Sequence, residues 1–131
     1  MSESRDQAYT GGQPLNGKAL QLDLGAEGRS LLDEARLAAN GRAARTLVKE
    51  RALRLTLLAL KGGAGIPEHR ANGPVSIHVI EGAVVIGVGD TSHALAVQQA
   101  VVIDADIVHS VVAQQESVIL LTIAMAGLRA D

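Results

Sequence analysis

The sequence predicts one all-β domain, a sandwich or barrel, preceded by a single short helix. From residue 45 onward, short runs rich in Val, Ile, Leu and Thr alternate with Gly, Asp, Asn or Gln punctuation, which is typical of such folds. The predicted strands are residues 45–49, 53–61, 66–71, 75–81, 84–88, 91–97, 100–104, 107–113 and 117–126. A chain of 131 residues fits one domain, and 47% hydrophobic residues can supply its core.

The first 44 residues have a different character. Residues 1–18 are polar and aperiodic, which predicts a flexible N-terminal arm. Residues 19–44 form a lead-in with a helix expected over residues 30–39, because Ser30 suits an N-cap and Asn40-Gly41 is a stop signal. We expect the barrel to span residues 45–128. The helix would bury a stripe formed by Leu31, Leu32, Ala35 and Ala38.

Composition excludes several classes of function. The chain has no cysteine, which rules out disulfides, thiolate catalysis and cysteine-ligated zinc. A single Tyr, no Phe or Trp, and a net charge of -2 disfavour binding to nucleic acid or to an anionic membrane. No signal peptide and no apolar run of about 18–20 residues is present, so we expect a cytoplasmic protein.

Two segments resemble the two sequence motifs of the cupin family. GGAGIPEHRANGPVSIHVIEG resembles the first motif, with its glycine at Gly63 or Gly65, a histidine at His69 and the closing glycine at Gly82. QQAVVIDADIVHSVV resembles the second motif, whose histidine matches His109. The resemblance covers residues 45–126 and implies a small single-domain cupin-type jelly-roll barrel.

The family habit also implies a homodimer. Two features of the sequence support it: the apolar run 117–126, and Arg-rich first strands that face an otherwise acidic remainder.

The chain departs from the family at the metal ligands. A complete cupin site offers three histidines and one carboxylate to a divalent metal, but Ala71 stands at the second histidine and Val75 at the glutamate. With two ligands left, binding of Zn, Fe, Mn, Ni or Cu would be weak, since typical sites use three or more protein ligands. In the second motif, the expected glycine, proline and glycine are replaced by Gln98, Asp104 and Asp106.

The alternation of side chains along a strand predicts which histidines face the inside of the barrel. In the cupin arrangement position 75 points inward, which places Val75, Ile77 and Val79 inside the barrel and His78 outside it. The family pattern puts both His69 and His109 inside.

His93 is an additional candidate. A hairpin turn at Gly89-Asp90 would pair Val88 with Thr91 and Ile86 with His93. His93 then shares a face with Leu95 and Val97, which could aim it into the cavity. Its position on an expected edge strand favours a hydrogen-bonded histidine without a metal.

Three functions remain compatible with these residues, because a fold alone does not fix a function. The favoured hypothesis is a non-enzymatic protein that binds a small ligand in the barrel, with His69 and His109 lining the site. The alternative is a divalent-metal-dependent enzyme of oxygenase or isomerase type that uses His69, His109 and His93. A solid barrel without a cavity would instead indicate a structural or partner-binding protein.

Overall fold

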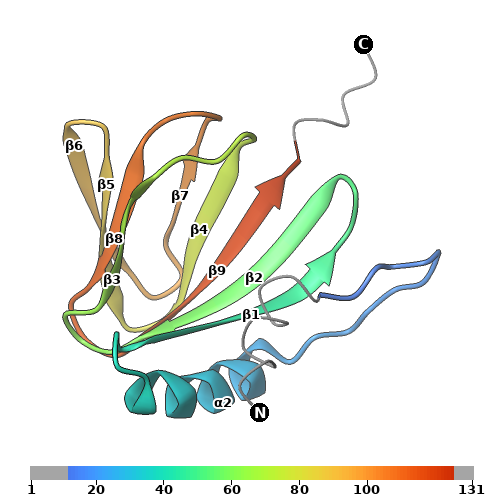
Figure 1. Cartoon of the computed structure of the whole chain (residues 1–131), viewed down its shortest axis with the longest axis horizontal. Helices are drawn as coiled ribbons and strands as arrows, with labels where there is room; N and C mark the ends of the chain where they lie inside the picture. Colours follow the sequence, from blue (N-terminus) through green and yellow to red (C-terminus); the bar gives the residue numbers. More distant parts are fainter. Residues whose placement is uncertain (1–11, 126–131) are drawn as a thin grey trace.

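Two antiparallel sheets pack face to face, with one helix on the outside (Figure 1). A computed structural model of the chain describes residues 12–125. The five-stranded sheet has the order β1-β2-β9-β4-β7 and the four-stranded sheet the order β3-β8-β5-β6. This architecture confirms the predicted jelly-roll fold. The strands are β1 (Arg42–Lys49), β2 (Leu53–Leu60), β3 (Gly65–His69), β4 (Val75–Glu81), β5 (Ala83–Val88), β6 (Thr91–Ala96), β7 (Ala100–Ile103), β8 (His109–Ala113) and β9 (Ser117–Ala124).

Each predicted strand has a counterpart in the structure. The hairpin register is the predicted one, with Val88 opposite Thr91 and Ile86 opposite His93. The first strand begins at Arg42, three residues before the expected start at residue 45, and β8 begins at His109 instead of residue 107. Of the predicted N-terminal arm, residues 1–11 lie outside the described residues, whereas Gln13 is bonded to the edge of β1.

The helix begins earlier than the sequence predicted. Helix α2 spans Leu24–Leu37, and its N-cap is Asp23, whose Oδ1 accepts a hydrogen bond of 3.0 Å from the Ala26 amide. The expected N-cap at Ser30 is therefore wrong. The first two turns contain Gly25 and Gly28, and because glycine disfavours helix, these turns do not stand out as helical in the sequence. No helix among the described residues is long and apolar enough to cross a bilayer.

One of these glycines has a packing role. A Cβ on Gly28 would lie 3.1 Å from a methyl carbon of Val118 on β9, so the bare glycine lets the helix approach the sheet closely. Of the expected stripe, Leu31, Leu32 and Ala35 are buried in the same interface, whereas Ala38 is the half-buried C-cap of the helix. Tertiary packing thus overrides helix propensity at this position.

A second cluster of apolar side chains fills the space between the sheets. Val75, Ile77 and Val79 are at most 3% exposed and face this lumen, as the strand alternation predicted. They pack against Ile86 and Val111 of the four-stranded sheet. The cluster consists of Val, Ile, Leu and Ala side chains without Phe, Tyr or Trp, so burial of alkyl groups supplies its stabilisation.

Gly82, in the turn between β4 and β5, is required by both backbone and packing. Its φ is +89°, and a Cβ there would lie 2.2 Å from the carbonyl oxygen of Glu116. Gly63 has nearly the same φ of +87°, but a Cβ there would meet nothing within 4 Å. Comparing substitutions at these two glycines therefore separates the cost of a positive φ from the cost of a steric clash.

We therefore expect Gly63→Ala to cost about 1 kcal/mol of unfolding free energy, from left-handed strain alone. Gly82→Ala should cost roughly 3 kcal/mol or more, because the turn at Glu116 must also move. Urea unfolding of both variants measures the difference. Equal midpoints for the two variants would contradict the steric argument.

Candidate functional site

The structure brings His69 and His109 into contact inside the mouth of the barrel. They are cross-strand partners at the end of β3 and the start of β8. Their ring centroids lie 4.3 Å apart and the ring planes meet at 61°, an edge-to-face arrangement. His109 is only 4% exposed, whereas His69 is exposed to solvent.

A repeated local contact orients the two rings. The Nδ1 of His69 lies 3.0 Å from the carbonyl oxygen of Pro67, and the Nδ1 of His109 lies 3.0 Å from that of Ile107. A carbonyl oxygen can only accept, so Nδ1 donates in each ring and the neutral form carries its proton there. Both Nε2 atoms are left as acceptors, able to bind a metal or a donor group of a ligand.

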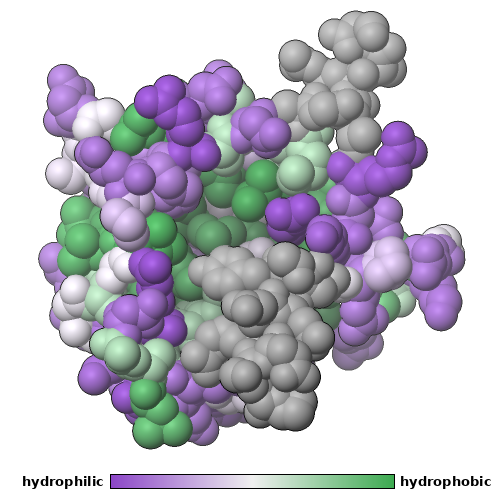
Figure 2. Space-filling view, in the orientation of Figure 1, coloured by the Kyte–Doolittle hydropathy of each residue, from purple (hydrophilic) through white to green (hydrophobic). Residues whose placement is uncertain are grey.

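A small apolar cavity adjoins this pair. Its volume is about 90 Å³, room for about three waters. In Figure 2, which looks between the two sheets, hydrophobic residues form the floor of a hollow with a polar rim. The cavity contradicts a fully packed barrel. Its lining is Ile66, His69, Ala71, Val75, Ile77, His109, Val111, Leu121 and Ile123.

Comparison with solved structures supports the fold. A conserved protein of unknown function from Streptococcus pyogenes gives a TM-score of 0.66 at 24% identity, covering 85% of this chain and 91% of that one. A cupin superfamily protein from Desulfitobacterium hafniense gives 0.63 at 17% identity, covering 70% and 86%. The chain has the cupin fold. No protein-family model matches the sequence, and a search of curated proteins finds no significant match.

The cupin fold also occurs in enzymes. A salicylate 1,2-dioxygenase from Pseudaminobacter salicylatoxidans gives a TM-score of 0.67 at 16% identity, over 76% of this chain but only 33% of that one. At such identities the comparison shows the fold and leaves the chemistry of the site to be argued from its own residues.

The donor set does not fit the usual cupin metal. Ala71 and Val75 both line the cavity beside the two histidines, so all four ligand positions of the motif converge on one place. Two of them carry alkyl groups, and no group of three or more His, Cys, Asp or Glu within residues 12–125 could hold a metal ion. Two imidazoles fall short of the three protein ligands of typical catalytic sites.

The other two histidines lie apart from this pair. His93 is exposed on the edge strand β6, and its Nε2 lies 3.3 Å from the Thr91 hydroxyl. Of its two apolar neighbours, Leu95 is buried but Val97 is 49% exposed, beyond the end of the strand. His78 is on the outer face of β4, where its Nε2 donates to Gln98 Oε1 at 2.8 Å.

The backbone keeps the shape of the second cupin motif although its glycines are gone. Gln98 and Asp106, which stand at the two glycine positions, have φ values of +68° and +65°. Positive φ is uncommon for residues other than glycine, and Asp tolerates it better than Gln. Asp104 and Asp106 are exposed and neither lines the cavity.

Arg54 was not among the residues that the sequence pointed to. On β2 it has the parity of Thr56 and Leu58, and therefore faces the lumen. Its Nε is buried and has no hydrogen-bond partner in the described part of the chain. The available signal was a cation inside the apolar run LRLTLLAL.

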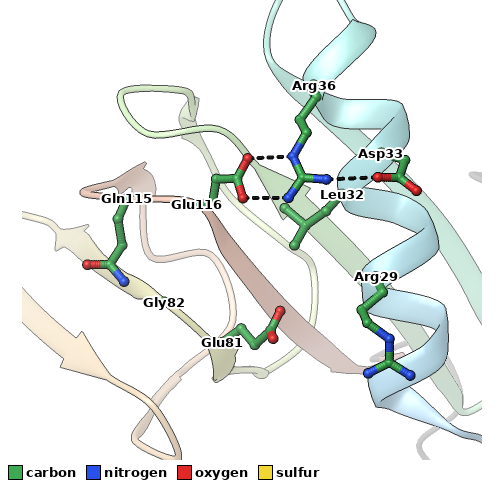
Figure 3. A pocket seen from close by; sticks show the side chains of 8 residues that line it. All are labelled: Arg29, Leu32, Asp33, Arg36, Glu81, Gly82, Gln115 and Glu116. Carbon is green, nitrogen blue, oxygen red and sulfur yellow. Dashed lines mark hydrogen bonds and ion pairs between the residues drawn. The ribbon is translucent and has the colours of Figure 1, made fainter.

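A wider polar cleft of about 520 Å³ lies between α2 and the turns at the other end of the barrel (Figure 3). Arg36 makes two hydrogen bonds to Glu116, of 2.6 and 2.7 Å, and a third of 2.8 Å to Asp33. These bonds raise the pKa of Arg36 and lower the pKa of Glu116 from its ordinary value. We interpret the Arg36–Glu116 ion pair as a structural clamp that connects the helix to the turn before β9.

Restoring the two missing donors should create a metal site. We expect Ala71→His combined with Val75→Glu to bind Ni²⁺ or Zn²⁺ more than about 100-fold tighter than the native chain, because two ligands become four. Calorimetry on metal-free protein measures the affinities. The matched control combines Ala71→His with Ser76→Glu on the outer face of β4. An equal gain in the control would contradict the convergence of the four positions.

The clamp should depend on pH. The Glu116 pKa is lowered in the folded state, chiefly by its hydrogen bonds to Arg36, so its stabilisation is present at pH 7 and is lost as pH falls through that pKa. Glu116→Gln should therefore lower the Tm at pH 7, and the difference from the native chain should vanish well below pH 4. Calorimetry across pH 3–7 measures it. Exposed Glu68→Gln is the control, and an undiminished difference at pH 3 would contradict the mechanism.

Proposed function

We propose that this protein binds a small, mainly aliphatic molecule in the barrel, with His69 and His109 accepting hydrogen bonds from it. The observation that carries the proposal is the pair of Nδ1–carbonyl contacts, each 3.0 Å long, which leave both Nε2 atoms as acceptors. An alkyl-lined cavity of about 90 Å³ beside them favours a ligand of a few carbons that carries a hydroxyl or amine donor.

The lining supports binding more than catalysis. Apart from the two imidazoles, the side chains around the cavity are alkyl groups, so no carboxylate stands there as an acid, base or metal ligand. A metal-dependent oxygenase or isomerase would need at least one further protein donor. The described residues offer none in a group of three or more, and the enzyme hypothesis therefore ranks second.

The test uses NMR spectra of the histidine rings. The proposal expects Nδ1 to be protonated and Nε2 unprotonated in His69 and His109 at neutral pH. Titration with a panel of three- to five-carbon alcohols and diols should then shift the Nε2 signals of these two rings saturably. His78 and His93 serve as internal controls, since they lie away from the cavity.

A pair of variants localises the binding. Ala71→Leu fills the cavity from its rim and should abolish the shifts, whereas Ala94→Leu, on an exposed position of β6, should leave them unchanged. Failure of every compound at about 50 mM to shift either ring would overturn the proposed function.

A further inference from the structure

The two sheets end in four edge strands, β1, β7, β3 and β6, and these differ in how well their edges are protected. Gln13 is bonded to the edge of β1, and β7 has only four residues. Strand β3 contains Pro67, Glu68 and a register shift. Short strands, prolines, charged side chains and bulges keep edge strands from pairing with other chains. Strand β6 (TSHALA) has six residues and none of these features, and Figure 1 shows it at the margin of the molecule.

Backbone contacts show which groups of β6 point to its free edge. The Ala96 amide donates to Gln99 Oε1 at 2.8 Å, and the Ala96 carbonyl accepts from the Gln99 amide at 3.0 Å. Ala96 therefore directs both groups away from β5. Alternate residues of an antiparallel ladder point the same way, so Ser92 and Ala94 also direct N–H and C=O to the free edge. Nothing within residues 12–125 bonds to these four groups, and residues 91–94 are all exposed.

The four free groups are self-complementary. Two β6 strands related by a two-fold axis at His93 place Ser92 of one copy opposite Ala94 of the other, and Ala94 opposite Ser92. Each such pair exchanges two hydrogen bonds, so the two pairs form four bonds and use every free group. Moving the axis by one residue would instead require Ala96, whose groups are already bonded, or Asp90 in the turn. The free groups therefore favour the axis at His93.

We propose that two copies of this chain associate through their β6 strands and join their four-stranded sheets into one continuous sheet. The strand has no Asp, Glu, Lys or Arg, so the pairing opposes no like charges. His93 is exposed although Ile86, its partner on β5, is fully buried, which shows that the opposite sheet leaves this part of β6 uncovered.

The size of this contact predicts a weak dimer. One pair of six-residue strands buries less than the roughly 800 Å² per partner of a standard interface, so we expect a Kd of about 0.1 mM. Sedimentation equilibrium of the native chain from about 20 µM to about 1 mM measures it. The mass should rise with concentration from that of one chain toward that of two.

A charge swap at His93 tests the register. The two His93 side chains meet across the axis in a pair that is not hydrogen-bonded, where side chains lie closest. His93→Glu alone and His93→Lys alone should each weaken association at least about 10-fold, because identical charges then oppose each other. An equimolar mixture of the two variants should recover at least the native affinity, because Glu then meets Lys across the axis.

The matched controls are Val102→Glu and Val102→Lys, at a position of β7 that is 73% exposed. Each should associate as the native chain does, and mixing them should change nothing. Circular dichroism verifies that every variant is folded. Recovery in the mixture of His93 variants also excludes misfolding as the cause of their weaker association.

Three results would overturn the proposal. A native chain that stays monomeric at about 1 mM would do so, and would leave the β6 edge open to an extended segment of a different protein. Native affinity in both single His93 variants would place the interface elsewhere on the molecule. A mixture of His93 variants that associates no better than either variant alone would exclude the axis at His93.

Discussion

Burial of β2 and of the first part of β9 on both faces is the constraint on which the rest of the structure depends. Alternate residues of β2 and β9 face either the lumen or helix α2, so both kinds of position must be apolar in the middle of these strands. The run 117–126 is apolar for this reason, because β9 is a central strand. Its composition no longer argues for a subunit interface. Arg45 likewise pairs with Glu27 and Glu34 of the helix in the same chain, and the homodimer stays a prediction.

The cupin backbone and the cupin metal chemistry are separable in this chain. Gly82 is retained where a side chain would collide with Glu116 and Ser117, and Gln98 and Asp106 hold left-handed conformations at the places of two family glycines. The ligand positions are under no such steric requirement. Ala71 and Val75 line the cavity and turn that part of the wall into alkyl surface. Loss of the donors therefore need not cost the fold.

Much of this could be predicted from the sequence, because a period of two is a local signal. The alternation at Val75, Ile77 and Val79 and the register of the β5–β6 hairpin both follow from neighbouring residues. The start of α2 could not be predicted, since Gly28 is favourable only against Val118 on a strand ninety positions later. The exposure of His93 depends on how far the opposite sheet extends over the edge strand. Both features are determined by tertiary packing, which a local sequence pattern does not reveal.

Arg54 illustrates the same limit of sequence-based prediction at the candidate site. Its parity could be read from the strand, but the absence of any partner for its Nε within the described residues is a property of the assembled lumen. In this lumen the two imidazoles present acceptors, whereas the guanidinium presents donors only. The two kinds of group are complementary in hydrogen bonding, and both lie toward the same end of the barrel. Which side chains meet in the lumen, and which of their hydrogen-bonding groups are left without a partner there, therefore follows from the assembled sheets and not from a local pattern in the sequence.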